Sequence, residues 1–360
     1  MKIAILQPYI EGIGGAQRVI ETYALYLQKQ GHDVEIFTQR YNPKTAYPGF
    51  KNLKISAIGL KSKFFSPFIF MFKKFRDFDV VIANDWPTHF ASLINNNVFW
   101  ICYSPKRDFY DLREYYWSNA SFLGKVVLWL KKVLFQKIDK ISAQRARIII
   151  ANSKNVQARI KKYYGRDARV LYHGINCSDY KNENYSNYIL SVGRFVPAKR
   201  IDIVIKSMGF VKNKDVKLYI AGDGPDRDKI VELCKNYPNV KFLGSVPDKK
   251  LVKLYANCLA VISVCKNEDW GLVPLEAGAS GKVIIGENSG GLKESVINNK
   301  TGFLLDNVDE KSIAETIDFI CNNRKLAIKM GEEARKNVKK FDWKNLLPKL
   351  EKLIKTSMKV

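Results

Sequence analysis

The chain has 360 residues, a hydrophobic fraction of 46% and a formal net charge of +25, from 60 lysines and arginines against 35 aspartates and glutamates. This composition is that of a globular protein, the length suits about two domains, and no segment is of low complexity. The basic excess favours anionic partners: nucleic acid, anionic lipid headgroups or phosphorylated substrates. Charge alone does not choose among them.

The same sequence gives no sign of a membrane span, a leader or a metal site. No stretch approaches the ~18 uncharged apolar residues of a membrane-spanning helix, and the first 15 residues lack the charged start and cleavage site of a signal peptide. The six cysteines form neither a C-x-x-C pair nor a zinc-like spacing. We therefore expect a cytoplasmic protein with reduced thiols and no bound metal.

Short apolar runs alternate with helical patterns along the first half of the chain. Residues 2–7 predict a buried strand, and 14–31 predict an amphipathic helix that stops at Gly31. Further strands are predicted at 33–38, 79–84, 98–103 and 147–152. Apolar runs of this kind are typical of strands covered on both faces by helices, as in a parallel sheet.

The pattern restarts after a polar connection at 171–187. A helix is predicted at 199–211, and strands are predicted at 187–193, 216–222, 239–244, 259–265 and 282–286. We therefore predict an α/β protein with two Rossmann-like, doubly wound domains facing a central cleft: an N-terminal domain (1–175) and a C-terminal domain (176–340). The amphipathic stretch within 341–360 suits packing on either domain, including a return to the first.

Ligands of doubly wound sheets bind beyond the carboxyl ends of the strands, so the loops there are candidates for chemistry. Gly12, Gly14 and Gly15 follow the first strand, where backbone N–H groups and a helix N-terminus can bind an anion. Gln17 breaks the G-x-G-x-x-G pattern and no acid ends the second strand, which disfavours a nicotinamide dinucleotide site. The alternative is a tight turn without a ligand.

Two further loops carry charge. Arg194 and Lys199 follow the strand at 187–193, and such a pair suits a diphosphate, although surface charge on a basic protein is an equal alternative. The Gly-Asp-Gly-Pro turn at 222–225 carries Asp223, for which a structural role is favoured over ligand binding.

Glu268 and Glu276 stand seven residues apart in NEDWGLVPLEAGASGKVIIG (267–286). Glu268 is predicted in the loop after a strand and Glu276 in the first turn of the next helix, at one strand-end crevice. One carboxylate can accept two ribose hydroxyls, and the other can contact sugar hydroxyls or stabilise charge at an anomeric carbon. Alternatively, Glu276 complements the helix dipole and Glu268 is solvated.

This stretch resembles the E-x7-E segment of the retaining glycosyltransferases of family 4, which have the two-Rossmann GT-B fold. Residues 192–208, 220–230 and 243–258 are similar to that family's successive motifs, in the same order. Residues 12–38 resemble its N-terminal Gly-Gly loop and first helix, and 151–176 resemble the segment that leads to the hinge between the domains. The resemblance covers nearly the whole chain, and its C-terminal motifs are the more specific.

The resemblance implies a nucleotide-sugar donor, UDP- or GDP-linked, held mainly by the second domain, with no cofactor and no divalent metal. Transfer would retain the anomeric configuration through a front-face displacement. The implied site residues are Glu276 at the ribose, Glu268 near the donor sugar, Arg194 and Lys199 at the leaving diphosphate, backbone N–H groups around Trp270, Gly271 and Leu272 at donor oxygens, and Gly14 and Gly15 closing over the diphosphate.

The N-terminal domain departs from the family's pattern. Asn84 stands where many relatives have a histidine, and Tyr103 and Ser104 replace a His-Thr pair in the segment YSPKR. We therefore name no general base. The acceptor-side candidates are Asp85, His89, Tyr103 and Arg107.

Residues 60–78 and 122–140 interleave lysines with large apolar residues in the domain that binds the acceptor in this family. In the second segment a single helical face holds the apolar residues Leu123, Val127, Leu130, Leu134 and Ile138. Such a face packs on a core or lies on anionic lipid. The hypothesis is an enzyme peripheral to the cytoplasmic face of a membrane, acting on a lipid-linked or surface-glycan precursor.

Two other functions remain open from the sequence. A synthase that makes a soluble glycoside, or a hydrolase of the same donors, would share the donor motifs. A basic nucleic-acid-binding protein is disfavoured, because it has no need of the glycine loop and the paired glutamates.

Overall fold

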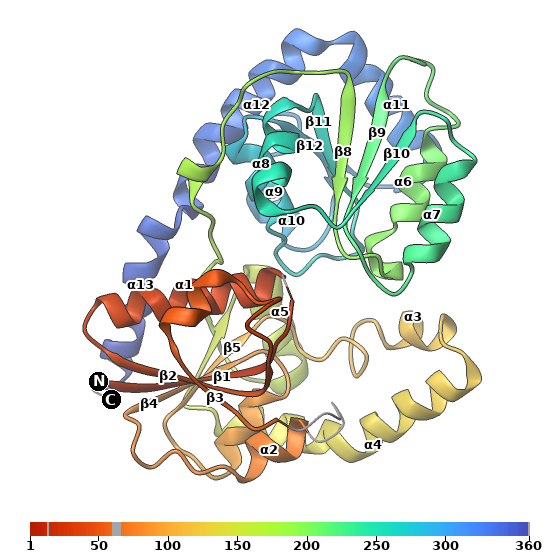
Figure 1. The fold of residues 1–360 in the computed structure, drawn as a ribbon. Helices are drawn as coiled ribbons and strands as arrows, with labels where there is room; N and C mark the ends of the chain where they lie inside the picture. The colour runs from red at the N-terminus through yellow and green to blue at the C-terminus, as the bar shows by residue number, and fades with distance from the viewer. Residues whose placement is uncertain (13, 60–65, 359–360) are drawn as a thin grey trace. The chain divides into compact units, whose positions relative to one another are not determined.

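Figure 1 shows the fold in a computed structural model that describes residues 1–12, 14–59 and 66–358. The chain forms two compact units: Met1–Tyr172 with Leu346–Val360, and His173–Asn345. Each unit is an α/β domain around one parallel sheet, and the predicted fold class of two Rossmann-like domains is confirmed. Helix α13 (Trp343–Met358) begins in the second unit and continues in the first from Leu346.

The first unit contains a seven-stranded sheet in the order β3-β2-β1-β4-β5-β6-β7. All of its strand pairs are parallel, and Ile3 lies opposite Val34 on one side and Val80 on the other. The strands are β1 (Lys2–Ile10), β2 (Asp33–Tyr41), β3 (Lys54–Ala57), β4 (Val80–Asn84), β5 (Val98–Cys102), β6 (Ile148–Ala151) and β7 (Arg169–Val170). The central strands β4 and β5 are buried at every residue, which explains their continuous apolar sequences.

Helices pack around this sheet and hold α13 to the first unit. The buried face of α1 consists of Val19, Ile20, Tyr23, Ala24 and Leu27. In α13, Leu350 and Ile354 are fully buried, and Glu351 lies 3.4 Å from the ring of His32. The helices are α1 (Gly15–Lys29), α2 (Ser66–Phe72), α3 (Arg113–Ser118), α4 (Phe122–Arg145) and α5 (Lys154–Tyr164), with 3-10 turns η1 (Pro48–Asn52) and η3 (Thr88–Leu93).

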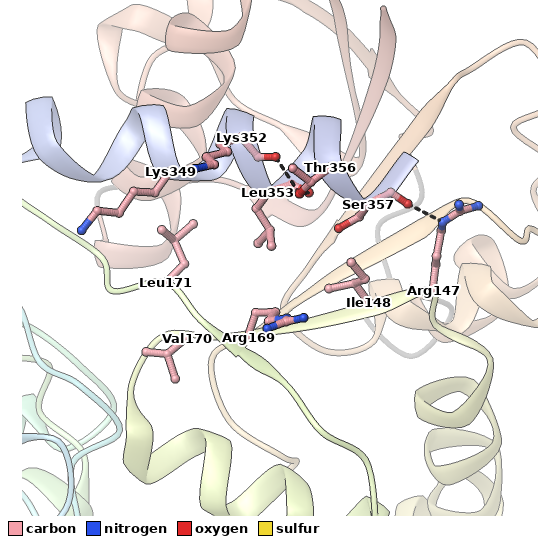
Figure 2. A pocket seen from close by; sticks show the side chains of 10 residues that line it. All are labelled: Arg147, Ile148, Arg169, Val170, Leu171, Lys349, Lys352, Leu353, Thr356 and Ser357. Atoms are coloured by element: carbon pink, nitrogen blue, oxygen red, sulfur yellow. Dashed lines mark hydrogen bonds between the residues drawn. The ribbon is translucent and has the colours of Figure 1, made fainter. Parts of the chain in front are cut away.

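A basic groove lies beside α13 at the amino ends of β6 and β7 (Figure 2). Its cationic side chains are Arg147, Arg169, Lys349 and Lys352. Arg147 donates from Nε to the carbonyl of Ser357, 3.0 Å away, so one of these cations fastens the end of α13 to the sheet. The groove is therefore at the end of the sheet opposite to the one where ligands of doubly wound folds bind.

The second unit has a six-stranded parallel sheet in the order β10-β9-β8-β11-β12-β13. The strands are β8 (Tyr188–Val192), β9 (Lys217–Ala221), β10 (Val240–Gly244), β11 (Ala260–Ser263), β12 (Val283–Glu287) and β13 (Gly302–Leu305). The chain direction across the sheet reverses between β8 and β11. In doubly wound folds this switch point is where the ligand crevice lies.

The helices of the second unit differ from the sequence prediction at one place. The helix predicted at 199–211 is split into a 3-10 turn, η5 (Pro197–Lys199), and α6 (Ile201–Ser207), because Arg200 between them has a positive φ of 50°. The others are α7 (Arg227–Lys235), α8 (Asp248–Asn257), α9 (Val273–Ala279), α10 (Leu292–Ser295), α11 (Glu310–Asn322) and α12 (Arg324–Val338), with η4 (Cys177–Asp179) and η6 (Lys339–Phe341). Within the described ranges, no helix of either unit has the length and apolarity to cross a bilayer.

Candidate active site

The loop after β8 is held in place by close backbone contacts with the turn after β9. A Cβ atom on Gly222 would lie 1.9 Å from the carbonyl oxygen of Gly193, and one on Gly224 would lie 2.4 Å from that of Phe195. The amide of Phe195 donates to the carbonyl of Asp223 at 2.9 Å. The Gly-Asp-Gly turn therefore supports the loop that carries the candidate diphosphate ligands.

Lys199 and Glu268 form an ion pair at the switch point. Lys199 Nζ lies 2.5 Å from Glu268 Oε2, and the two side chains are 30% and 14% exposed. Burial lowers the pKa of Lys199, but the negative charge of Glu268 outweighs this and the net shift is upward, so the lysine is cationic. Two residues 69 apart in the chain thus place opposite charges in one crevice.

Arg194 extends from the same loop and is exposed. In the described part of the chain, no ion pair engages its guanidinium. A free planar cation beside Lys199 retains its full capacity for a bidentate contact with an anion.

Glu276 is a buried carboxylate in the first turn of α9, 6% exposed. The hydroxyl of Tyr255 donates to its Oε2 at 2.7 Å. Burial, together with the charge of Glu276, raises the pKa of Tyr255 well above its usual range, so the tyrosine stays a protonated donor. A carboxylate has two oxygens that together can accept about four hydrogen bonds, so Glu276 can also accept from the hydroxyls of a ligand.

Trp270 is a core residue rather than a ligand-facing side chain. It is 2% exposed, its indole N–H donates to the carbonyl of His173 at 2.8 Å, and its ring meets Phe341 edge to face at 4.9 Å. Gly271 beside it has a φ of 77°, which favours glycine. A role for the segment 270–272 therefore rests on its backbone, as the sequence analysis proposed, with the indole as its anchor.

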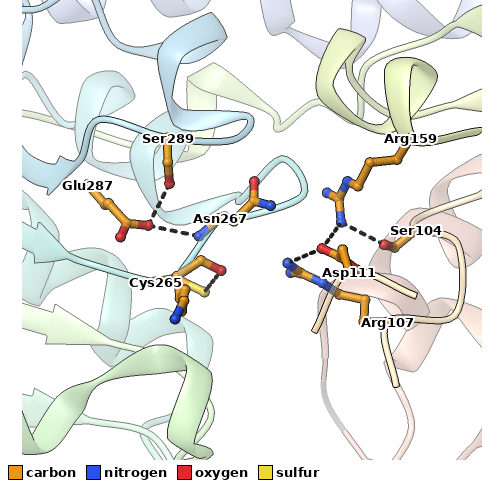
Figure 3. A network of polar contacts seen from close by, with 9 residues as sticks. Ser104, Arg107, Asp111, Arg159, Cys265, Asn267, Glu287 and Ser289 are labelled. Atoms are coloured by element: carbon orange, nitrogen blue, oxygen red, sulfur yellow. Dashed lines mark hydrogen bonds and ion pairs between the residues drawn. The ribbon is translucent and has the colours of Figure 1, made fainter. Parts of the chain in front are cut away.

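Glu287, at the end of β12, is a site residue that the sequence analysis did not identify. Its Oε2 accepts from the amide of Asn267 at 2.8 Å and from the hydroxyl of Ser289 at 2.5 Å (Figure 3). Its Oε1 lies 2.9 Å from Arg200 Nη1. Asn267 has a positive φ of 46°, so this carboxylate holds the strained start of the loop that carries Glu268. A strand-ending acid followed by Asn-Ser-Gly-Gly was the available signal.

Gly291 lets the next loop pack directly on the Glu268 segment. Its amide donates to the carbonyl of Glu268 at 2.7 Å, and a Cβ atom there would lie 2.5 Å from the carbonyl oxygen of Asp269 and 2.7 Å from the Cα of Trp270. Its φ of −70° suits any residue, so the restriction is purely one of space.

We predict that Gly291→Ala displaces the Glu268 segment. Because backbone atoms cannot move aside as a side chain does, the free energy of unfolding should fall by about 1–3 kcal/mol, which lowers the midpoint of thermal unfolding. Gly193→Ala is the control. A Cβ atom there would lie 4.0 Å from its nearest neighbour, a side-chain carbon of Lys199, so the stability of this variant should hardly differ from that of the wild type. Equal midpoints for the two variants would contradict the packing argument.

The glycine loop of the first unit presents the N-terminus of α1. Gly14 is the N-cap, in extended backbone, and as a glycine it has no side chain with which to cap the helix; the first turn, from Gly15, holds no acid. Gly12 has a φ of 90° and its amide donates to Thr45 Oγ1 at 3.2 Å. Residue 13 lies outside the described residues. A 15-residue helix with this start is suited to an anion.

Asp85 and Tyr103 follow β4 and β5 on the two loops beside the switch point of the first sheet. Asp85 has a φ of 64°, and its carbonyl accepts from Thr88 Oγ1 at 2.8 Å. Burial, reinforced by Tyr23 and Asp85, raises the pKa of Tyr103 well above its usual range. Tyr103 is therefore a neutral hydroxyl, which makes it a hydrogen-bonding group and not a base.

His89 does not suit the acceptor-side role proposed for it. The turn η3 places it in the interior, fully buried, with its ring stacked on Trp100 at 4.0 Å and Nε2 3.1 Å from Asp139 Oδ1. The hydroxyls of Tyr110 and Tyr164 donate to the other oxygen of Asp139 at 2.7 and 2.8 Å. His89 is thus part of a buried polar cluster that joins η3 to α4 and has no access to a substrate.

Arg107 belongs to a charged network on the loop after β5 (Figure 3). Its Nη2 donates to Asp111 Oδ2 at 2.9 Å, and Arg159 donates to the same oxygen at 3.2 Å and to Ser104 Oγ at 3.0 Å. At 15% exposure, the Arg107 side chain keeps limited access to solvent. One carboxylate shared by two guanidiniums leaves a net positive charge here.

Two family models match the chain and together span residues 13–337. "Glycosyltransferase Family 4" matches residues 13–179, and "Glycosyl transferases group 1" matches residues 178–337. An uncharacterized glycosyltransferase of Methanocaldococcus jannaschii is 29% identical, over 57% of this chain and 58% of that protein. The alpha-1,3/1,6-mannosyltransferase ALG2 of Mus musculus is 24% identical, over 89% of this chain and 88% of its own.

Solved structures show the same fold over the whole length. Sucrose-phosphate synthase from Thermosynechococcus elongatus superposes with a TM-score of 0.80 at 19% identity, covering 99% of this chain and 98% of that one. HepE of Anabaena, in complex with UDP-glucose, superposes with a TM-score of 0.79 at 17% identity, covering 99% and 100%. The predicted family is confirmed: the chain belongs to glycosyltransferase family 4 and consists of the two Rossmann-like domains of the GT-B fold.

Proposed function

We propose that this glycosyltransferase moves a hexosyl unit from a nucleoside-diphosphate sugar to a hydroxyl acceptor, with retention of the anomeric configuration and without a divalent metal. The observation that carries the proposal is the joint placement of a buried acid, Glu276, and the Lys199–Glu268 pair around the switch point of the second sheet. A nucleoside diphosphate needs hydroxyl acceptors and cations in such a crevice, and this one supplies both.

Each residue has a part in this proposal. Glu276 accepts the ribose hydroxyls, while Lys199 and Arg194 take the charge of the diphosphate in place of a metal ion. Glu268 contacts the sugar, and its ion pair keeps it oriented. The N–H groups of the segment 270–272 bind donor oxygens. Gly14 and Gly15, at the start of α1, offer a second set of N–H donors to an anion.

The transfer step follows from these charges. The bond between the anomeric carbon and the β-phosphate oxygen breaks, and the diphosphate leaves with the electron pair next to Lys199 and Arg194. The acceptor oxygen bonds to the same face of the anomeric carbon, and its proton passes to the departing phosphate oxygen. Because entry and departure share one face, the configuration is retained, and no separate base is needed from the first unit.

We further propose that the donor is a UDP- or GDP-sugar and that the acceptor is a lipid-linked or surface-glycan precursor at the cytoplasmic face of a membrane. The UDP-glucose complex of HepE supports a UDP-sugar donor, and the mannosyl transfer named for ALG2 supports the transfer of a hexosyl unit. The net charge of +25 supports an acceptor that lies at an anionic membrane surface.

A thermal-shift screen against UDP-, GDP- and ADP-sugars tests the donor, because a ligand that binds only the folded state raises the midpoint. The donor selected is then incubated with lipid-linked and soluble acceptors, and the anomeric configuration of the product is read by NMR. We expect one nucleotide class to stabilise the protein and the product to keep the donor configuration. No stabilisation, an inverted product, or free sugar from water alone would each overturn the proposal.

A further inference from the structure

The first half of α4 is an apolar helix surface that the described residues of the first unit leave exposed. Phe122 is 80% exposed, Leu123 75% and Val133 58%. The described buried residues of this 24-residue helix all lie in its second half: Phe135, Asp139, Ser142 and Ala143. The core-facing alternative for this segment therefore fails for residues 122–134. Figure 1 shows this part of α4 extending beyond the sheet, next to α3.

The exposed apolar side chains are not confined to a narrow stripe. We call the surface of residues 122–134 the α4 tip; its exposed large apolar residues are Phe122, Leu123, Val126, Val127, Trp129, Leu130, Val133 and Leu134. The neighbouring helix α3 adds Tyr116 and Trp117, both more than a third exposed. A water-soluble surface seldom gathers this much apolar area unless a partner covers it.

The α4 tip is a formed helix rather than a frayed end. Ser121 is its N-cap, and its hydroxyl accepts from the amide of Gly124 at 3.2 Å. The second half of the helix is anchored through Asp139, which lies between His89 and two tyrosine hydroxyls. The apolar surface is thus presented on a helix with one capped end and one anchored end.

The charges of α4 indicate what covers it. The helix carries the cations Lys125, Lys131, Lys132, Lys137, Lys140 and Arg145, and its one acid, Asp139, is fully buried. A second copy of this chain would bring two sets of cations together without a carboxylate from α4 to offset them. An anionic bilayer offers hydrocarbon to the apolar side chains and phosphates to the lysines, whose long stems reach from one to the other.

We propose that the α4 tip, with Tyr116 and Trp117, is the membrane-docking element of this protein, and that it inserts into the headgroup region of a bilayer containing anionic lipid. Only the purpose of the docking, which is to bring a lipid-linked acceptor to the first unit, rests on the proposed function. Membrane docking itself requires neither a donor nor catalysis, so the two proposals fail separately.

Flotation with vesicles of phosphatidylglycerol and phosphatidylcholine, against phosphatidylcholine alone, tests the docking. The wild-type protein should float with the anionic vesicles and be released by high salt. The triple variant Phe122→Ser, Leu123→Ser, Val133→Ser should lose roughly tenfold or more in partitioning, since each buried methylene contributes about 0.8 kcal/mol. Lys125→Gln with Lys131→Gln and Lys132→Gln should lose the preference for anionic vesicles.

Matched controls lie elsewhere on the surface. Phe210→Ser and Phe319→Ser remove two exposed apolar side chains, 53% and 45% exposed, from the second unit, and Lys349→Gln with Lys352→Gln removes cations from the groove beside α13. Neither change should affect flotation. The inference is overturned if the wild type does not float with anionic vesicles. It is overturned equally if the tip variants float as the wild type does, or if the controls lose flotation as much as the tip variants. So would self-association of the wild type that the tip variants abolish.

Donor affinity separates this inference from the proposed function. The tip variants should bind the nucleotide sugar as the wild type does, since no residue of the α4 tip belongs to the candidate active site. A wild type that binds vesicles but no nucleotide sugar contradicts the proposed function alone. A wild type that transfers sugar to a soluble acceptor but ignores anionic vesicles contradicts the docking alone.

Discussion

Glu276→Gln is expected to weaken binding of the nucleoside diphosphate by roughly 10- to 100-fold, the effect of about 1.5–3 kcal/mol for hydrogen bonds to a charged group. The carboxylate is buried at 6% exposure and already accepts from Tyr255. An amide of the same shape keeps the packing but offers one acceptor atom in place of two. Calorimetric titration with UDP and GDP measures the loss.

Tyr255→Phe is the control for this prediction. It removes the 2.7 Å hydrogen bond to Glu276 without touching a ligand, so it should lower the unfolding midpoint and leave nucleotide affinity nearly unchanged. A 2′-deoxy nucleotide sharpens the test, because the wild type should discriminate against it and Glu276→Gln should not. If the variant loses affinity for the ribo and deoxy nucleotides equally, Glu276 does not bind the ribose.

The parts of the fold that the sequence predicted are the strands buried on both faces. β4 and β5 are apolar at nearly every position because helices cover both sides of the sheet. Such continuous apolar runs predict a strand without knowledge of the strands that pair with it. β3, β7 and β13 were not predicted. They have only two to four residues. β3 and β7 contain no buried residue, and β13 alternates buried with half-buried residues, so the formation of these strands depends on the neighbouring strand.

The candidate site divides in the same way. Glu268, Glu276 and Lys199 stand near glycines or prolines that mark strand ends, and this local signal was sufficient to name them as candidates, while their roles were implied by the family resemblance. That Lys199 pairs with Glu268 is a consequence of sheet order, which brings β8 beside β11. Glu287 was not identified because its partners Asn267 and Arg200 lie 20 and 87 residues away in the sequence. A local sequence pattern does not indicate contacts between residues so far apart in the chain.

His89 and helix α4, both in the first unit, show one limit of reading a sequence by its periodicity. Periodicity identifies which residues share a helix face, but it does not identify what lies against that face. His89 was placed near the acceptor because it follows a strand end, whereas η3 turns it onto Trp100. For the apolar residues of α4 the sequence left a core-facing and a lipid-facing position open, and in residues 122–134 the described structure leaves them exposed.

Lys199→Ala is expected to lower kcat by about 100- to 1000-fold, the effect of removing one preorganised group that stabilises charge in a transition state. The lysine is cationic and 30% exposed, so a diphosphate can reach it beside Glu268. The variant also leaves the carboxylate of Glu268, 14% exposed, without its ion-pair partner. Its unfolding midpoint should therefore fall as well, and the two effects must be separated.

The double variant Lys199→Ala with Glu268→Gln separates them. Neutralising the acid removes the uncompensated charge, so the midpoint should recover while kcat stays low. Arg194→Ala is the matched cation control: it is exposed, so its midpoint should match the wild type while kcat falls. If the double variant recovers kcat together with the midpoint, Lys199 acts only by holding the loop. If kcat stays low with a normal midpoint, and lies well below the kcat of Glu268→Gln alone, the lysine stabilises the leaving diphosphate, because the loss then exceeds what Glu268 itself contributes at the sugar.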